Sequence, residues 1–180
     1  MDAEPLYTPL FCEENIWQLA RQMLDDGGDP DTLWVLFFSN PRQTVLMLNQ
    51  YRAGPQGYIA WDYHVVLQAG DLLYDLDTIL PFPVNAVRYF SESFPVQSAL
   101  DESYRGWVRR IPASSFVERF YSDRSHMQDS VAKSEYPSWP AITPANPDAI
   151  ALKDYWNMHK VLDDGSRVMR VEEYVRLLRP

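Results

Sequence analysis

Apolar residues recur every three or four positions near the start of the chain, at Ile16, Leu19, Ala20, Met23 and Leu24. This spacing places side chains on one face of a helix. The glutamates at positions 13 and 14 suit the first turn of such a helix, and the glycines at positions 27 and 28 suit its end. We therefore predict a helix over residues 12–24, with Cys12 at its N-terminus.

The pattern then changes to apolar runs that are typical of strands. Residues 33–38 are apolar throughout, as expected for a central strand that is buried on both faces. We predict further strands over 44–48, 58–67, 72–76 and 106–111, a helix over 84–94, and a strand-to-helix ending over 168–178. Together these elements predict an α+β fold in which the N-terminal helix and covering helices pack on a mostly antiparallel sheet.

Four prolines interrupt the pattern between residues 128 and 148, at Pro137, Pro140, Pro144 and Pro147. A stretch with so many prolines cannot continue a helix or a central strand. We predict that residues 128–148 form an irregular excursion over the surface. The length of the chain predicts that this excursion belongs to a single domain over residues 1–180.

Two consecutive predicted strands, 58–67 and 72–76, flank a short linker that contains Gly70 and therefore favour a hairpin. A turn at the middle of this linker places His64 opposite Asp75, and directly opposed residues have Cβ atoms about 4.5–5.5 Å apart. The alternation then gives the hairpin an apolar core face and a face with titratable groups, namely Asp62, His64, Asp75 and Asp77. Such groups are costly in a sheet unless they are paired or used.

Composition and charge narrow the classes of function. The 180 residues include 25 acidic and 16 basic side chains, which gives a formal net charge of −9. Nucleic acids and anionic membranes both require a basic surface, so we expect neither as a partner. We see no signal peptide and no stretch of about 18 apolar residues that would cross a membrane. We expect a cytoplasmic monomer, present also in the nucleus if the source is eukaryotic.

Cys12 is the single cysteine, so no disulfide forms within the chain. At an ordinary pKa near 8.5, only about 3% of a thiol is ionised at pH 7, so a nucleophilic cysteine needs help. A helix N-terminus favours the thiolate, His64 can take the proton, and Asp75 can orient the imidazole. The residues alone leave two structural alternatives open. Cys12 can be a small buried apolar residue, and the His-Asp pair can serve only to stabilise the sheet.

Four short sequence blocks surround these candidate residues. In chain order they are Cys12-Glu13-Glu14-Asn15-Ile16-Trp17, Trp61-Asp62-Tyr63-His64-Val65, Tyr74-Asp75-Leu76-Asp77-Thr78 with Leu80-Pro81-Phe82-Pro83, and Ser122-Asp123-Arg124-Ser125-His126-Met127. The four blocks resemble the protein N-terminal glutamine amidohydrolases, and the second is similar to the hallmark motif of that family. The blocks cover about residues 7–127, and the region after Met127 resembles the family less.

The resemblance implies a cysteine hydrolase whose fold is similar to the papain and transglutaminase group. It implies that Cys12 is the nucleophile, His64 the general acid and base, and Asp75 the acid that orients His64. The implied reaction deamidates an N-terminal glutamine of a protein or peptide to glutamate, through a thioester, and releases ammonia. It requires no metal and no organic cofactor. In eukaryotes the product of this family enters an N-degron pathway.

The α-ammonium group of such a substrate needs an acidic or carbonyl partner near Cys12. The candidates follow Cys12 directly or lie on the polar face of the hairpin, and they are Glu13, Glu14, Asn15, Asp62 and Asp77. Each of them has a simpler alternative role at a helix end or in a hydrogen bond of the sheet.

Two other classes of function remain open. The first is another thiol enzyme on the same fold, such as a peptidase, a transglutaminase or a deamidase of internal glutamine, and its products would distinguish it. The second is a binding module without catalytic activity. The presence of Cys12, His64 and Asp75 together argues against a binding module.

Overall fold

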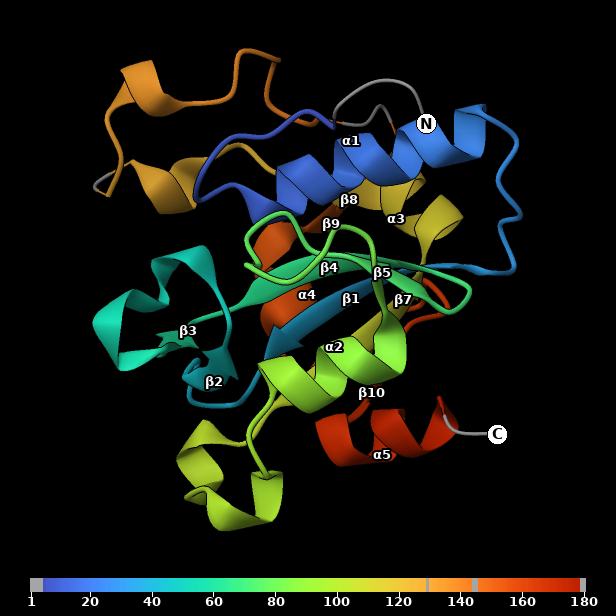
Figure 1. Cartoon of the computed structure of the whole chain (residues 1–180). Coiled ribbons are helices and arrows are strands. Elements are labelled where there is room, and N and C mark those ends of the chain that lie inside the picture. Colours follow the sequence, from blue (N-terminus) through green and yellow to red (C-terminus); the bar gives the residue numbers. More distant parts are fainter. Residues whose placement is uncertain (1–4, 129, 144–145, 179–180) are drawn as a thin grey trace.

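A six-stranded sheet forms the centre of the molecule (Figure 1). The computed structural model describes residues 5–128, 130–143 and 146–178. The strands lie in the order β10-β7-β1-β4-β5-β6, and each neighbouring pair is antiparallel. Their bounds are Leu33–Ser39 (β1), His64–Ala69 (β4), Leu72–Tyr74 (β5), Val84–Asn85 (β6), Trp107–Pro112 (β7) and Arg167–Arg170 (β10). The mostly antiparallel sheet predicted from the sequence is therefore confirmed.

Two smaller pairs of strands lie beside this sheet. β2 (Val45–Leu48) and β3 (Tyr58–Trp61) form an antiparallel ribbon. β8 (Phe120–Tyr121) runs parallel to β9 (Ile150–Ala151), and these two strands flank the proline-rich segment 128–148. Their pairing therefore joins the two ends of that segment.

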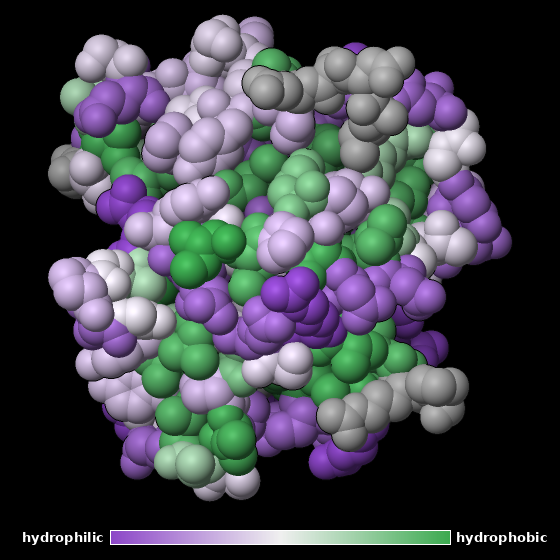
Figure 2. Space-filling model, in the orientation of Figure 1, coloured by the Kyte–Doolittle hydropathy of each residue, from purple (hydrophilic) through white to green (hydrophobic). Residues whose placement is uncertain are grey.

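Helices cover both faces of the central sheet. Their bounds are Cys12–Asp25 (α1), Ala86–Ser93 (α2), Ala113–Arg119 (α3), Leu152–Trp156 (α4) and Val171–Leu177 (α5). α1, α3 and α4 pack on one face, whereas α2 and α5 pack on the other (Figure 1). On the side of the molecule that Figure 2 shows, hydrophobic and hydrophilic residues are interspersed. Within the described ranges, no helix combines the length and apolar character needed to cross a membrane.

β1 contributes to two hydrophobic cores because its side chains alternate between the faces. Val35 and Phe37 belong to the core beneath α1 and α3, whereas Leu36 and Phe38 belong to the core beneath α2 and α5. All four side chains are fully buried. This double burial explains the uninterrupted apolar run, and it confirms the predicted central strand.

The predicted strand 58–67 is wrong as a single element. It divides into β3 and β4, which belong to different sheets and are separated at Asp62 and Tyr63. The physical reason lies in β1, where the last residue paired with β4 is Phe38, opposite His64. Residues 58–61 pair instead with β2, and Asp62 and Tyr63 pair with neither strand.

The predicted register of the β4–β5 hairpin is also wrong, by two residues. The structure pairs Leu67 with Tyr74 and Ala69 with Leu72, so the turn lies at Gly70 and the residue after it. Gly70 has a φ of +55°, a conformation that glycine adopts without strain. A shift of two residues keeps every side chain on its predicted face, because the side-chain period of a strand is two. His64 and Asp75 therefore still share a face, although they are not paired on the backbone.

The other predicted helices and strands agree with the structure to within a few residues. α1 and α2 confirm the helices over 12–24 and 84–94, and β7 confirms the strand over 106–111. β10 followed by α5 confirms the strand-to-helix ending. Within residues 128–148, the described part contains one short helical turn, Lys133–Glu135, and a single bridge from Ile142 to Ser122. Pro144 lies outside the described residues.

Candidate functional site

A cavity of about 350 Å³ lies where the start of α1 meets the start of β4. The described residues that line it are Leu10, Cys12, Trp61, Asp62, Tyr63, His64, Asp77, His126, Met127, Ser130, Val131 and Trp156. The structure thus brings Cys12 and His64 to one cavity, together with two of the candidate binding residues, Asp62 and Asp77. Asp75 reaches this site through His64.

Cys12 is the first residue of α1, where free backbone N–H groups favour an anion. Burial nevertheless raises the pKa of the Cys12 thiol well above its ordinary value, and the Glu13 carboxylate raises it further. A hydrogen bond with the backbone of Val65 on β4 lowers the pKa, but it does not outweigh burial. The thiol therefore stays protonated unless a base takes its proton or a cation approaches.

His64 and Asp75 form a buried hydrogen-bonded pair. Nε2 of His64 lies 2.9 Å from Oδ1 of Asp75, and both side chains are almost inaccessible to solvent. Burial alone would lower the pKa of His64, but the carboxylates of Asp75, Asp77 and Glu13, with Asp75 the largest contributor, together raise that pKa. Burial would likewise raise the pKa of Asp75, but His64 and further hydrogen-bond donors lower it. Each partner therefore stabilises the charged form of the other.

The second ring nitrogen of His64, Nδ1, is buried and has no hydrogen-bond partner among the described residues. Because a carboxylate can only accept, the proton of a neutral imidazole lies on Nε2, which donates to Asp75. Nδ1 is then left with a free lone pair. The ring of Trp61 is nearly parallel to the imidazole, with centroids 5.4 Å apart and planes at 15°. Asp75 and Trp61 together fix the orientation of a ring that can accept a proton at Nδ1.

Asp75 is held by two residues that sequence reasoning missed. Nε2 of Gln50 donates to Oδ2 at 3.0 Å, and the hydroxyl of Tyr89 donates to the same oxygen at 2.8 Å. The helical pattern of α2 places Tyr89 on a buried face, but no local spacing shows that its hydroxyl meets Asp75. Gln50 lies in a connection between strands and carried no recognisable signal.

One group of potential metal ligands occurs among the described residues. Ligand atoms of His64, Asp75 and Asp77 all lie within 4.8 Å of one another. Nε2 of His64 and both oxygens of Asp75 already take part in hydrogen bonds with protein groups. A metal would have to replace those bonds, so the arrangement suits a hydrogen-bonded His-Asp pair better than a metal centre.

Glu13 lies beside the thiol and is fully buried. Its Oε2 is 3.7 Å from Sγ of Cys12 and accepts a hydrogen bond from the hydroxyl of Tyr63 at 3.0 Å. Its Oε1 lies 3.5 Å from Nε2 of His126. Glu13 is therefore enclosed by protein side chains behind the wall of the cavity.

Glu14 and Asn15 hold the surroundings of the site together. Both oxygens of Glu14 pair with the guanidinium of Arg124 at 2.9 and 2.7 Å, and Nε1 of Trp139 donates to Glu14 at 2.8 Å. The side-chain amide of Asn15 exchanges two hydrogen bonds with the backbone of Thr8. Neither residue lines the cavity, and each has its polar atoms occupied by the protein.

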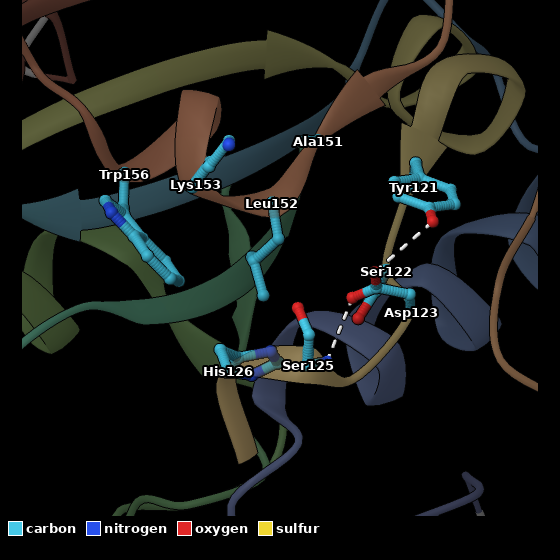
Figure 3. Close-up of a pocket in the computed structure, with 9 residues that line it drawn as sticks. All are labelled: Tyr121, Ser122, Asp123, Ser125, His126, Ala151, Leu152, Lys153 and Trp156. Carbon is cyan, nitrogen blue, oxygen red and sulfur yellow. Dashed lines mark hydrogen bonds between the residues drawn. The ribbon is translucent and has the colours of Figure 1, made fainter. Parts of the chain in front are cut away.

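A second cavity, of about 300 Å³, lies on the other side of His126 and Trp156, which line both spaces. Figure 3 shows Leu152 and Trp156 of α4 on one side of it, with His126 and Ser125 on the other. Asp123 accepts hydrogen bonds from the backbone N–H of Ser125 and the hydroxyl of Tyr121. This second cavity lies next to the Cys12 cavity but contains neither the thiol nor His64.

Comparison with known proteins places the chain in one family. The family model described as N-terminal glutamine amidase matches residues 7–178, so the likeness extends well beyond Met127. A protein N-terminal glutamine amidohydrolase of Danio rerio is 35% identical over 148 residues, which are 79% of this chain and 71% of the relative. The proteins of the same name from Bos taurus and Homo sapiens are 33% and 34% identical, over 94% and 85% of this chain and 85% and 78% of their own.

Proposed function

Because the chain belongs to the N-terminal glutamine amidase family, we propose that it hydrolyses the side-chain amide of a glutamine at the N-terminus of a protein or peptide. The products are an N-terminal glutamate and ammonia. The observation that carries this proposal is the cavity that Cys12 and His64 both line, with His64 fixed from behind by a buried carboxylate. A thiol, a base and an orienting acid are the groups that acyl transfer through a cysteine requires.

In the first half of the proposed reaction, His64 accepts the proton of the Cys12 thiol at Nδ1. The resulting thiolate attacks the carboxamide carbon of the glutamine side chain. The raised pKa of Cys12 means that this proton transfer must be assisted, and Asp75 assists it by stabilising the imidazolium. Backbone N–H groups at the start of α1 are suited to stabilise the oxyanion that forms.

The tetrahedral intermediate then collapses. The carbon–nitrogen bond breaks, His64 gives its proton to the departing nitrogen, and ammonia leaves. A water molecule, deprotonated by His64, attacks the thioester and releases the carboxylate and the thiol. One water is consumed for each amide, and the enzyme returns to its starting state. Asp75 acts on the reaction through His64 and is therefore a positioning residue.

We further propose that the chain is a single domain that belongs to the papain and transglutaminase group of folds. The features that support this grouping are a cysteine at the start of a helix, the packing of that helix on an antiparallel sheet, and a histidine on the facing strand. The proline-rich segment 128–148 contributes Ser130 and Val131 to the wall of the cavity.

The test is incubation of a Gln-first peptide with the wild type and with Cys12→Ala, followed by mass spectrometry and an ammonia assay. The wild type should convert the N-terminal glutamine to glutamate, whereas Cys12→Ala should be inactive. Peptides that begin with Asn or with acetylated Gln serve as controls and should remain unchanged. Equal reaction of internal glutamine would favour a general deamidase, and peptide cleavage or isopeptide products would favour a peptidase or a transglutaminase.

A further inference from the structure

The buried carboxylates around the cavity differ in how their negative charge is compensated. Glu14 forms an ion pair with Arg124, and Asp75 pairs with His64. Asp77 is only 3% exposed, yet no such cationic partner contacts it in the described part of the chain. A buried carboxylate without a cation is unfavourable, and Asp77 combines this deficit with a place in the lining of the cavity.

The hydrogen bonds of Asp77 show the same deficit. Among the described residues, its carboxylate accepts one hydrogen bond, from the hydroxyl of Tyr7 to Oδ1 at 2.7 Å. Burial raises the pKa of Asp77, and the charges of His64 and Arg52 and the Tyr7 bond only partly oppose that rise. Asp77 also lines the cavity with Cys12, so a ligand in the cavity can reach it.

We propose that Asp77 is the specificity residue that binds the free α-ammonium group of the substrate. This inference rests on the proposed function. The ammonium supplies the missing cation, and the short carbon chain of glutamine separates it from the amide that must reach Cys12. An acetylated or internal glutamine has no charge at this nitrogen and leaves Asp77 uncompensated. Asparagine is one methylene shorter, so it holds its amide closer to its α-ammonium group than glutamine does.

The other acidic candidates suit this role less well. Asp62 lines the cavity but is exposed, and it accepts a hydrogen bond from the backbone N–H of Tyr63. Exposed carboxylates gain little from a cation because water screens the charge. Glu13 is buried but does not line the cavity. Tyr63 donates to its Oε2, whereas its Oε1 lies 3.5 Å from Nε2 of His126 and has no hydrogen-bond partner among the described residues.

The test is a double-mutant-type cycle, in which the wild type and Asp77→Asn are each assayed with a substrate that has the α-amine and one that lacks it. One peptide begins with Gln, and the other carries the monoamide of glutaric acid, which keeps the side-chain amide but replaces the α-ammonium by hydrogen. With the wild type, loss of the amine should lower kcat/KM by about 10²-fold, mainly through KM, because a charge-assisted hydrogen bond is lost. With Asp77→Asn the same change should lower kcat/KM by less than about threefold.

Asp31→Asn is the matched control, because Asp31 is exposed and lies far from His64 along the sheet. It precedes Leu33 at the start of β1, whereas His64 pairs with Phe38 near the other end of that strand. This variant should discriminate between the two peptides as the wild type does. Tyr7→Phe leaves the carboxylate of Asp77 but removes its hydrogen-bond donor. It should weaken the discrimination partially, and it provides the test if Asp77→Asn does not fold.

Two results would overturn the assignment of Asp77. In the first, Asp77→Asn retains the wild-type preference for the free amine. In the second, Asp77→Asn lowers kcat for both peptides equally and shifts the pH profile, which would show that Asp77 positions His64 instead. If the wild type releases no ammonia from any Gln-first peptide, the proposed function fails, and this inference fails with it. If the wild type is active but the effects of Asp77→Asn and of removing the substrate amine are independent, only the assignment of Asp77 is refuted.

Discussion

Replacement of Asp75 by Asn removes one negative charge and keeps the shape of the side chain. In the wild type, Oδ1 accepts hydrogen bonds from His64 and from the backbone N–H of Asp77, while Oδ2 accepts from Gln50 and Tyr89. An Asn that keeps its oxygen at the Oδ1 position still orients His64. Its NH2 group then lies at the position of Oδ2, where the wild type has two donors.

The surroundings can accommodate that NH2 group. Oε1 of Gln50 is buried without a hydrogen-bond partner among the described residues, so rotation of the Gln50 amide presents an acceptor to it. The hydroxyl of Tyr89 can rotate and accept as well. We therefore expect Asp75→Asn to fold and to isolate the electrostatic contribution of the carboxylate.

We expect kcat to fall by about 10² to 10⁴, which corresponds to roughly 3–5 kcal/mol of transition-state stabilisation. The change should appear in kcat more than in KM, because Asp75 lies behind His64 and does not line the cavity. Without Asp75 the pKa of His64 should fall, since this carboxylate is the largest of those that raise it. Because neutral His64 must accept the thiol proton, its pKa sets the acidic limb of the pH profile, and that limb should move to lower pH.

Ammonia release from a Gln-first peptide measures kcat and KM across the pH range. Alkylation by iodoacetamide reports the reactivity of Cys12 alone, because the chain has one cysteine. Asp71→Asn, an exposed change in the hairpin turn, is the matched control and should behave as the wild type. If Asp75→Asn is folded and retains kcat within about threefold, or if its pH profile is unchanged, Asp75 does not assist His64 and the proposed triad is wrong.

Three further predictions concern stability, and urea unfolding measures each of them. Arg124→Met leaves Glu14 buried without its cation and should cost about 3–5 kcal/mol, so a loss below about 1 kcal/mol would contradict a structural role for this ion pair. Phe116→Ala opens a cavity beneath α3 and should also cost about 3–5 kcal/mol, and an unchanged midpoint would show that this core tolerates voids. The lowered pKa of Asp75 contributes stability that is fully present above its unfolded value of about 3.9 and is lost as the pH falls through the lower folded value. The stability difference between the wild type and Asp75→Asn should therefore shrink on acidification below about pH 4, and a difference independent of pH would refute this linkage.

Elements with a strong local pattern were predictable from the sequence. The helix that begins at Cys12 has apolar residues at helical spacing over its whole length, and glycines end it. The continuous apolar run in β1 predicted a strand that is buried on both faces, and the structure buries it on both faces. In each case one periodic signal, within one segment, determines the element.

Errors arose where an element depends on its neighbours. Nothing within residues 58–67 shows that β1 ends opposite His64, yet that ending divides the segment into two strands. The face assigned as polar also carries Val66 and Leu73, which pack in the core beneath α2. Contacts such as Arg124 with Glu14 join segments far apart in the chain, and no local spacing encodes them.

The association of His64 with Asp75 survived a wrong register for a physical reason. Alternate residues of a strand face the same side of the sheet, so a shift of two residues leaves every side chain on its original face. The ladder between β4 and β5 ends at Leu67 and Tyr74, before it reaches either residue. Beyond that point a side chain takes the place of a backbone partner, since Oδ1 of Asp75 accepts a hydrogen bond from the backbone N–H of Asp77. The polar groups are therefore concentrated where strand pairing stops, which is also where a cavity can open beside Cys12.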